Sequence, residues 1–410
     1  MTVKKDSINL HKMLKGKIEI RSRVSLDNAF DEKGTLGLIY TPGVAYVALE
    51  IGHRKKLAYD YTSKWNNVAI ICDGTRVLGL GNIGPEAALP VMEGKSVLFK
   101  ALGDINAIPL CINTQDKEEI IKFVKVIQPN FGAINIEDIE SPKVLEIVER
   151  LSKEISLPIF HDDQHGTAII TLAGLVNALK LVKKELDEVR VVISGSGSAG
   201  YGIFKILETA GCKDIIVTDT KGAIYSGRPD ITDNNPYKKE ISLNTNIRKL
   251  RGTLQDVIRE SDVFIGVSGK ADLLSRNMIE SMSEDAIVFA LSNPDPEIIP
   301  SSALKYGAKI VATGRSDFPN QINNAVVFPS VIRALLDLRA NNLSEFMLVS
   351  VAYAIANIVE DIHLRYDYII PKVDDPRIIP IVTKTIKKVL RKHIKTNINS
   401  KSSTRSSTRD

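Results

Sequence analysis

Short apolar runs alternate with longer amphipathic segments through most of this 410-residue chain. Continuous apolar runs are typical of strands buried in parallel sheets, and the segments between them show helical spacing. In the first half we expect strands at 67–72, 107–112, 133–136 and 158–160. In the second half we expect strands at 190–194, 214–218, 262–267, 286–291 and 309–312. This alternation predicts an α/β fold with two parallel sheets, followed by a mostly helical segment from residue 331 to 392.

Charge is concentrated at the C-terminal end. The formal net charge is +5, and the segment from Lys392 onward contributes +4 of it, from five basic residues and one acid. The rest of the chain is near neutrality and predicts no basic face, so we expect no nucleic-acid partner. The polar, Ser/Thr-rich segment 393–410 is expected to be a disordered basic tail.

The cysteines and the first residues indicate a reducing compartment. Cys72, Cys111 and Cys212 are widely spaced and lie in or beside apolar segments, which favours buried thiols over disulfides or a zinc site. The chain start lacks the apolar core of a signal peptide, and no apolar run approaches the length of a membrane span. We therefore expect a cytoplasmic protein with no membrane partner.

Two acidic pairs follow neighbouring strands of the first sheet. Glu137 and Asp138 follow the run 133–136, and Asp162 and Asp163 follow the run 158–160. Ligands of open α/β sheets bind beyond the carboxyl ends of the strands, so both pairs are expected on one rim. Like charges repel unless a cation lies between them, and hard divalent ions prefer oxygen ligands. One pair alone would be an ordinary acidic turn, but two pairs predict a metal site.

Two histidines flank the second acidic pair. Because carboxylates suit a hard ion better than imidazole does, we expect His161 and His165 to hold carboxylates in place and not to bind the metal.

The glycine pattern G-x-G-x-x-G occurs twice. The copy at 79–84 is weak, because no ribose-binding acid ends a well-defined next strand. The copy at 195–200 follows a strand, opens a helix and has Asp219 about 20 residues further on, which predicts a Rossmann-like dinucleotide domain. Asp219 favours NAD, whereas Lys221 could pair with the 2′-phosphate of NADP, so the nucleotide stays open. The expected cofactor-binding residues of this loop are Gly195, Ser196, Gly197, Ser198, Ala199 and Gly200.

Five further side chains are candidates for chemistry, and each also has an ordinary structural interpretation. Tyr40 precedes a Thr-Pro-Gly turn and could donate a proton. Lys95 lies among apolar neighbours, where burial and nearby charges would lower its pKa toward neutrality and make it a usable base. Arg76 could clamp a carboxylate, and the amides of Asn293 and Asn324 could bind the nicotinamide or a substrate carboxylate.

Together these motifs resemble the malic enzymes, in the short form found in bacteria and archaea. The resemblance runs from about Gly16 to Arg377 and rests on IYTPGVA, TRVLGLGNIGPEAALPVMEGKSVLFK, INIEDIESP, FHDDQHGTA, LSNPDPE and ATGRSDFPNQINN. It implies oxidative decarboxylation of L-malate to pyruvate and CO2, with NAD or NADP and with Mg²⁺ or Mn²⁺. Decarboxylation of oxaloacetate is a related or alternative reaction.

The resemblance also implies a role for each candidate. Lys95 resembles the general base, Tyr40 the general acid, and Asp162 the acid beside the lysine. The positions that resemble metal ligands are Glu137, Asp138 and Asp163. The positions that resemble substrate contacts are Arg76, Asn293 and Asn324.

The resemblance implies the domain organisation as well. We expect a substrate and metal domain at 1–165, a Rossmann-like NAD(P) domain at 166–345, and C-terminal helices at 346–392 that pack back on the core. A homodimer or larger homo-oligomer is expected, in which a neighbouring subunit completes the site. The rival of another class is a non-catalytic nucleotide sensor, which would need neither the metal carboxylates nor Lys95 and Tyr40.

Overall fold

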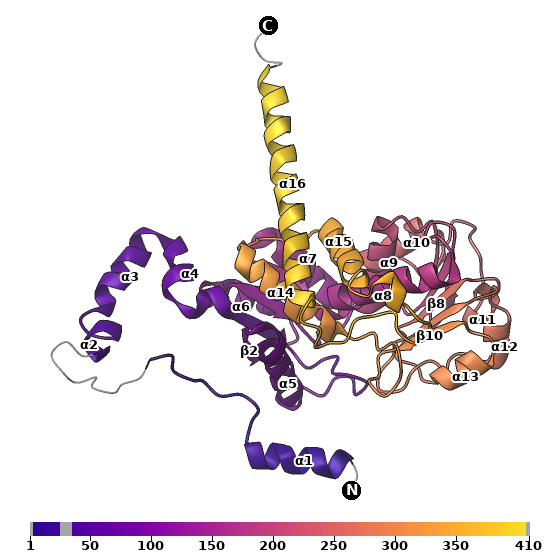
Figure 1. The fold of residues 1–410 in the computed structure, drawn as a ribbon, viewed down its shortest axis with the longest axis horizontal. Coiled ribbons are helices and arrows are strands. Elements are labelled where there is room, and N and C mark those ends of the chain that lie inside the picture. Colours follow the sequence, from indigo (N-terminus) through magenta and orange to yellow (C-terminus); the bar gives the residue numbers. More distant parts are fainter. Residues whose placement is uncertain (1–2, 25–34, 407–410) are drawn as a thin grey trace.

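The computed structural model describes residues 3–24 and 35–406, and it contains two parallel sheets with helices packed on their faces (Figure 1). The first sheet has the order β2-β1-β3-β4, and every neighbouring pair is parallel. Its strands are β1 (Asn67–Cys72), β2 (Asn106–Cys111), β3 (Ala133–Ile136) and β4 (Ile159–His161). The small parallel sheet predicted for the first half is confirmed.

Helices connect these strands, as parallel pairing requires. They are α5 (Pro85–Gly103), α6 (Lys117–Ile127) and α7 (Lys143–Glu154). Pro85 occupies the first turn of α5, where its missing N–H costs nothing. The Asp116 carboxylate caps α6 by accepting from the backbone N–H groups of Glu118 and Glu119. Cys72 and Cys111 are register partners on β1 and β2, and all three cysteines are free thiols.

The second sheet has the order β10-β9-β8-β5-β6-β7. Its strands are β5 (Arg190–Ser194), β6 (Asp214–Asp219), β7 (Gly222–Ala223), β8 (Val263–Gly266), β9 (Ile287–Ala290) and β10 (Ile310–Thr313). The five predicted strands are present and parallel, and β7 adds a short antiparallel edge. The helices of this half are α9 (Ser198–Thr209), α10 (Pro236–Asn244), α11 (Leu254–Val257), α12 (Arg276–Glu280) and α13 (Pro300–Lys305). The Rossmann-like arrangement is confirmed.

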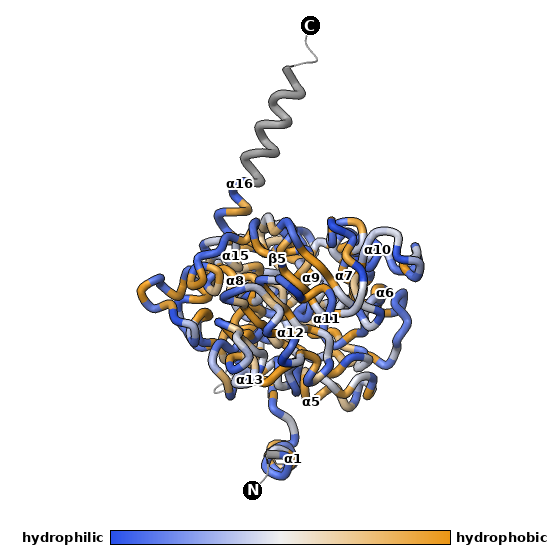
Figure 2. Tube along the Cα trace, turned by 90° about the vertical axis from the view of Figure 1, so that its right-hand side faces the viewer, coloured by the Kyte–Doolittle hydropathy of each residue, from blue (hydrophilic) through white to orange (hydrophobic). Residues whose placement is uncertain are grey.

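One apolar helix, α8 (Thr167–Val182), joins the two halves and is buried along most of its length. It packs against α9 and α15 (Glu345–Ala356), while α14 (Phe328–Leu338) packs on α5 of the first half. The last helix, α16 (Ile378–Ser406), packs on α14 and α15 and then projects from the body (Figure 1), and Figure 2 shows the hydropathy of its first turns beside the body. The side chains from 393 on and residues 407–410 lie outside the described residues, so the predicted disordered tail stays a prediction.

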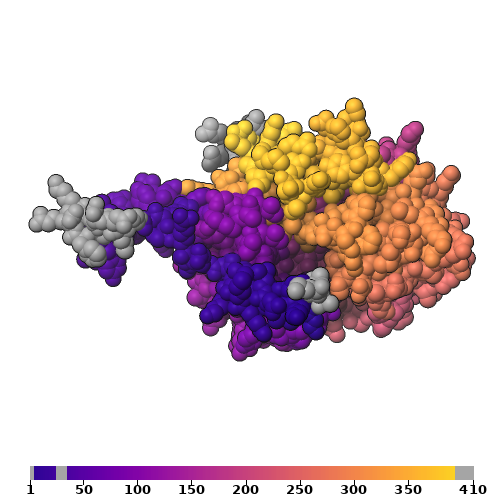
Figure 3. All heavy atoms as spheres, turned by 60° about the horizontal axis from the view of Figure 1, so that its bottom comes forward, coloured from indigo at the N-terminus to yellow at the C-terminus, as the bar shows by residue number. Residues whose placement is uncertain are grey.

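The N-terminal elements lie beside the body. They are α1 (Val3–Leu14), α2 (Thr35–Ile39), α3 (Val44–His53) and α4 (Ala58–Tyr61). We call residues 35–53 the N-terminal arm, because α2 and α3 extend from one side of the molecule (Figure 3) and bury no residue. The remaining one-turn elements are η1 (Lys55–Leu57), η2 (Ser63–Asn66), η3 (Gln128–Asn130), η4 (Asp162–Gly166), η5 (Asn324–Val326) and η6 (Asp361–His363).

The expectation that no segment reaches the length of a membrane span needs correction. Among residues 3–24 and 35–406, two helical stretches, Thr35–His53 and Asp162–Val182, are long and apolar enough to cross a membrane, judged by length and composition alone. The second is 72% buried within the protein, as a core helix is. The first is divided by the turn at residues 40–43, which separates α2 from α3.

Candidate active site

The turn after β4 carries the second acidic pair into α8. Residues Asp162–Gly166 form a π-type turn, η4, which widens the helix start and places the acids beside the end of β3. A Cβ atom on Gly166 would lie 2.2 Å from Oδ1 of Asp162. Glycine is therefore required there if the Asp162 carboxylate is to fold back against its own turn.

Lys95 lies between the two acidic pairs. Its Nζ is 2.7 Å from Oε1 of Glu137 and 2.5 Å from Oδ2 of Asp162, and the side chain is only 8% exposed. Burial alone would lower the pKa of Lys95, but the charges of Asp162 and Glu137 outweigh burial and raise it. The expectation of a lowered lysine pKa is therefore wrong for the protein as described, because two carboxylates adjoin the amine.

The acidic rim holds more negative charge than Lys95 balances. Burial raises the pKa of Glu137 well above its usual range, and burial together with the charge of Asp163 raises that of Asp138 to about 7. Oδ2 of Asp138 and Oδ1 of Asp162 are buried and have no hydrogen-bond partner in the protein. Buried polar oxygens are nearly always satisfied, so this rim is suited to a further cation or proton.

Within residues 3–24 and 35–406, no group of three or more His, Cys, Asp or Glu side chains stands ready to hold a metal ion. Asp163 is 41% exposed and lies 3.8 Å from Nε2 of His161. A metal at this rim would therefore need side chains from the ends of neighbouring strands to move closer together.

The two histidines have different surroundings. His161 is fully buried beside Asp163, its Nε2 makes no hydrogen bond, and burial lowers its pKa, which favours the neutral ring. His165 accepts a hydrogen bond from the backbone N–H of His161 at 3.1 Å, and burial lowers its pKa to about 3. His165 lines a different cleft, so only His161 is placed to hold a rim carboxylate, as predicted for both.

One cleft of about 520 Å³ joins the acidic rim to the glycine loop of the second sheet. The predicted residues that line it are Arg76, Lys95, Glu137, Asp138, Asp162, Asp163, Gly197, Ser198, Ala199, Asn293 and Asn324. They come from both halves of the chain, and the carboxyl ends of both sheets supply most of them. A two-domain cleft with convergent polar groups and shifted pKa values is the usual form of an active site.

Arg76 and Asn324 are positioned by contacts with the rim. The backbone N–H of Arg76 donates to the carbonyl oxygen of Asp138 at 3.1 Å, and its guanidinium is exposed to the cleft. Nδ2 of Asn324 donates to Oγ1 of Thr167 at 3.1 Å, which ties it to the start of α8. The backbone of Arg76 and the side chain of Asn324 are thus anchored at the rim, and both side chains line the cleft.

The strong glycine loop has the geometry that its sequence predicts. Gly195 has φ +117°, and a Cβ on Gly200 would lie 1.9 Å from the carbonyl oxygen of Gly195, so no other residue fits. Asp219 ends β6 and accepts a hydrogen bond from the backbone N–H of Lys221 at 2.8 Å. Asp219 and Lys221 do not line the 520 Å³ cleft but lie where the next strand ends, as an adenosine-binding acid does.

The weak glycine copy has a packing role. A Cβ on Gly79 would lie 2.9 Å from Cδ of Pro294, so this glycine lets the first domain approach the loop that carries Asn293. The glycine pattern at 79–84 therefore serves packing between the two domains, which agrees with the absence of a ribose-binding acid after it.

Tyr40 is not brought to Lys95 within one chain. It follows α2 in the N-terminal arm, is 68% exposed, and does not line the cleft. Tyr40 can therefore serve as the predicted general acid only if its hydroxyl reaches the cleft by another route.

Glu297 was missed by the sequence reasoning. It is fully buried, and its carboxylate accepts from the backbone N–H groups of Ser268 and Ser292, both at 3.2 Å, and from the Ser292 hydroxyl at 2.5 Å. It thereby fixes the two loops that border the cleft beside Asn293. The signal that the sequence offered was Glu297 itself, an acid directly before the apolar pair Ile298 and Ile299 with no basic residue beside it.

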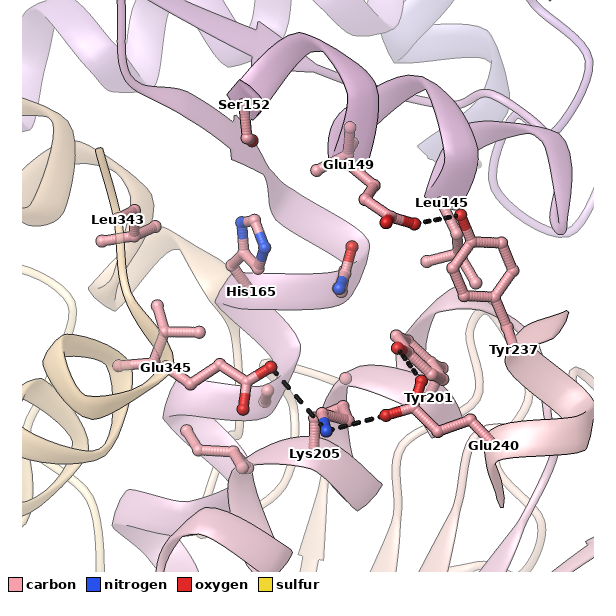
Figure 4. Close-up of a pocket in the computed structure, with 16 residues that line it drawn as sticks. Leu145, Glu149, Ser152, His165, Tyr201, Lys205, Tyr237, Glu240, Leu343 and Glu345 are labelled. Carbon is pink, nitrogen blue, oxygen red and sulfur yellow. Dashed lines mark hydrogen bonds and ion pairs between the residues drawn. The ribbon is translucent and has the colours of Figure 1, made fainter. Parts of the chain in front are cut away.

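A second, smaller cleft of about 290 Å³ lies on the other side of η4, between α7 and the helices α9 and α10 (Figure 4). The Tyr237 hydroxyl donates to Glu149 at 2.9 Å across the two domains. Lys205 donates to Glu240 at 2.9 Å, and the Tyr201 hydroxyl donates to the same carboxylate at 2.7 Å. Glu149 and Glu240 thus have hydrogen-bond donors of their own, whereas one buried oxygen of Asp138 and one of Asp162 at the rim have none.

Comparison with known proteins gives one family for both halves. The model "malic enzyme, N-terminal domain" matches residues 15–152, and "malic enzyme, NAD binding domain" matches residues 164–392. The bifunctional malic/malolactic enzyme of Bacillus subtilis is 49% identical over 386 residues, which are 94% of this chain and 92% of that protein. The NADP-dependent malic enzyme of Escherichia coli K12 is 38% identical, over 92% of this chain and 51% of that protein.

Solved structures agree. The NAD-dependent malic enzyme of Thermotoga maritima superposes with a TM-score of 0.88 at 44% identity, covering 93% of this chain and 99% of that one. The malic enzyme of Pyrococcus horikoshii gives a TM-score of 0.87 at 41% identity, covering 96% of this chain and 91% of that one. The chain therefore belongs to the malic enzyme family, the NAD(P)-dependent oxidoreductases that decarboxylate malate.

Proposed function

We propose that the cleft between the two domains is where this chain converts L-malate to pyruvate and CO2 while NAD or NADP is reduced, with a bound divalent metal. Family membership supports the reaction. The observation that carries the site is Lys95, held between Glu137 and Asp162 on the cleft that also receives the glycine loop. A nucleotide sensor without chemistry would have no use for this buried cluster.

The polar side chains of the cleft take distinct roles. Lys95, once neutral, accepts the proton of the C2 hydroxyl as hydride passes from C2 to the nicotinamide. Asp162, whose Oδ2 lies 2.5 Å from the amine, orients Lys95 and can accept a proton from it. The guanidinium of Arg76 suits bidentate pairing with a substrate carboxylate, and the amides of Asn293 and Asn324 orient the substrate or the nicotinamide.

The acidic rim suits a hard cation such as Mg²⁺ or Mn²⁺, which Glu137, Asp138 and Asp163 would hold. The support is the pair of buried oxygens without partners on Asp138 and Asp162, together with the uncompensated negative charge. Bound there, the ion would polarise the substrate oxygens as a Lewis acid and offset the carboxylate charge that keeps Lys95 protonated.

We further propose a homodimer in which the N-terminal arm of each subunit brings Tyr40 to the cleft of the other. The arm exposes Leu38, Ile39, Tyr40, Val44, Tyr46, Val47 and Leu49. So many exposed apolar side chains on one short arm favour an interaction surface, and exchanged arms would cover them on both subunits of a symmetric pair. The Tyr40 hydroxyl would then supply the proton that C3 needs after CO2 leaves.

The reaction is tested by absorbance at 340 nm with L-malate and Mn²⁺, run with NAD and with NADP, each with and without EDTA. Metal-dependent growth of the signal, with pyruvate as product, is expected. Nucleotide binding without any turnover of malate would instead favour another 2-hydroxy acid, and turnover unaffected by EDTA would remove the metal from the proposal.

The exchanged arm is tested by mixing two inactive variants, Lys95→Ala and Tyr40→Phe, under conditions that allow subunit exchange. If Tyr40 acts in the partner's cleft, a mixed dimer has one intact site, and activity should return to about a quarter of wild type. If Tyr40 acts in its own chain, every site lacks one group and the mixture stays inactive. Sedimentation of each variant checks that dimers form.

A further inference from the structure

Two thiols lie side by side where the first two strands of the first sheet end. Cys111 ends β2, the first strand in the sheet order, and Cys72 ends β1 beside it, where the two residues are register partners. Neighbouring strands lie about 4.8 Å apart, and a disulfide can join cysteines whose Cα atoms are about 4.4–6.8 Å apart. Because register partners point to the same face of a sheet, the two sulfurs can meet when their side chains turn.

The two thiols differ in exposure and in acidity. Cys72 is fully buried, whereas Cys111 is partly exposed. A hydrogen bond between the thiols raises the pKa of Cys72 and lowers that of Cys111. Burial and the charges of Asp138 and Glu86 oppose the lowering at Cys111 but do not cancel it. Since the thiolate is the reactive form, Cys111 is the thiol placed to meet an oxidant first, with Cys72 behind it as the second thiol.

We propose that Cys72 and Cys111 are a modification site, at which a hydroperoxide such as H2O2 converts the two thiols to a reversible disulfide. The Cys111 sulfur attacks one peroxide oxygen and becomes a sulfenic acid, while the O–O bond breaks and the other oxygen leaves as water with the Cys111 proton. The Cys72 sulfur then attacks the Cys111 sulfur, the S–O bond breaks, and the hydroxyl leaves as water with the Cys72 proton. Two thiols are thereby oxidised and one H2O2 is reduced to two waters. A small thiol reverses the step by exchange.

The disulfide acts on the catalytic cleft through the loop that follows β1. Neither cysteine lines the 520 Å³ cleft. The Cys72 sulfur accepts a hydrogen bond from the backbone N–H of Gly74 at 3.3 Å. The Gly74 carbonyl oxygen in turn accepts from two N–H groups at the far end of the loop 74–84, at 3.1 and 3.2 Å. Because a disulfide draws the Cys72 sulfur toward Cys111, it disturbs the bond to Gly74 and the loop that carries Arg76.

The site is tested by treating the purified wild type, Cys111→Ser and Cys212→Ser with H2O2 and counting thiols in denaturant before and after. Cys212 is the matched control, because it is buried and its burial raises its pKa to about 12. Wild type should fall from three thiols to one, with a Cys72–Cys111 linkage in peptide mass spectra that dithiothreitol removes. Cys212→Ser should fall from two thiols to none, and Cys111→Ser should keep both of its thiols.

Three results would each overturn the modification site, and none of them depends on turnover. They are a Cys111 sulfenic or sulfinic acid while Cys72 stays free, a linkage between the Cys111 residues of two subunits, and a loss of thiols in wild type no greater than in Cys111→Ser.

The effect on the cleft rests on the proposed function, in which Arg76 binds a substrate carboxylate. Oxidation of wild type should raise KM for malate about tenfold, with NAD binding unchanged, and Cys111→Ser should not respond. A confirmed disulfide with an unchanged KM would overturn the coupling to Arg76. Lack of malate turnover in the reduced wild type would count against the proposed function instead, since the thiol counts are independent of it.

Discussion

The two groups of buried carboxylates in this molecule end strands of similar parallel sheets, yet they have opposite charge balance. At the substrate rim, Lys95 pairs with two of four carboxylates, Glu137 and Asp162, and buried oxygens of Asp138 and Asp162 have no hydrogen-bond partner. At the adenosine corner beside the end of β6, three cations, Lys221, Arg228 and Lys238, face two carboxylates, Asp219 and Asp230. An excess of carboxylates favours a cation at the rim, as proposed, and an excess of cations favours an anion at the corner.

The strongest test of the rim removes its own cation. Lys95→Ala should lower kcat about 10³-fold, the contribution typical of a general base. Nucleotide binding should remain near wild type, because the adenosine corner and glycine loop are untouched. Steady-state kinetics and NADH fluorescence measure the two quantities. Lys100→Ala is the matched control, since Lys100 lies on the same helix and makes an exposed pair with Asp104.

Full turnover in the Lys95→Ala variant would exclude Lys95 as the general base. Equal losses of turnover and of nucleotide binding would show instead that Lys95→Ala disturbs the whole cleft, which thermal unfolding would confirm.

The next test removes one negative charge from the acidic rim. Asp163→Asn should raise the Mn²⁺ concentration needed for half-maximal activity at least about tenfold, since one charged oxygen ligand is lost. Asp361→Asn, in an exposed acid whose partner is Lys180, should leave the metal titration unchanged. A Mn²⁺ curve that is identical in Asp163→Asn and wild type would exclude Asp163 as a ligand.

The sequence predicted the positions of the rim residues better than their electrostatics. Parallel strands bring their carboxyl ends to one edge, so the meeting of Glu137 with Asp162 followed from the alternation of strands and helices. The raised pKa of Lys95 could not be foreseen, because it depends on two acids at 2.5 and 2.7 Å from the amine. Those distances come from tertiary packing, which the spacing along one helix does not specify.

Other parts of the site could not be predicted from the sequence, for a related reason. Arg228 and Lys238 reach Asp219 from outside the strand–loop–helix motif, so no local pattern connects them. Glu297 is fixed by serine side chains and N–H groups of two loops. Tyr40 was identified as a candidate, but its place outside the cleft depends on how the N-terminal arm leaves the body.

The pairing of Asp219 also predicts how nucleotide binding depends on pH. The folded-state pKa of Asp219 is lowered to about 2, so its stabilising pairing is present above its ordinary carboxyl pKa and is lost only as the pH falls toward 2. Binding of 5′-AMP should therefore show no titration of Asp219 near the ordinary aspartate pKa of about 4. Isothermal titration at several pH values measures this, and a change of affinity centred near pH 4 in wild type that is absent in Asp219→Asn would contradict the lowered pKa of Asp219.

The smallest effect is expected where carboxylates and donors are matched, in the 290 Å³ cleft behind η4. Tyr237→Phe removes the hydrogen bond to Glu149 that joins α10 to α7, and the Glu149 side chain is 50% exposed, so water can replace the donor. The free energy of unfolding should fall by about 1 kcal/mol or less. Because η4 carries Asp162 and Asp163 on its other side, a change of the Mn²⁺ requirement in Tyr237→Phe would show that this cleft is coupled to the rim. An unchanged Mn²⁺ requirement and unchanged NADP preference would confirm that balanced carboxylates take no part in either ligand site, and that charge imbalance, not acidity alone, distinguishes the two.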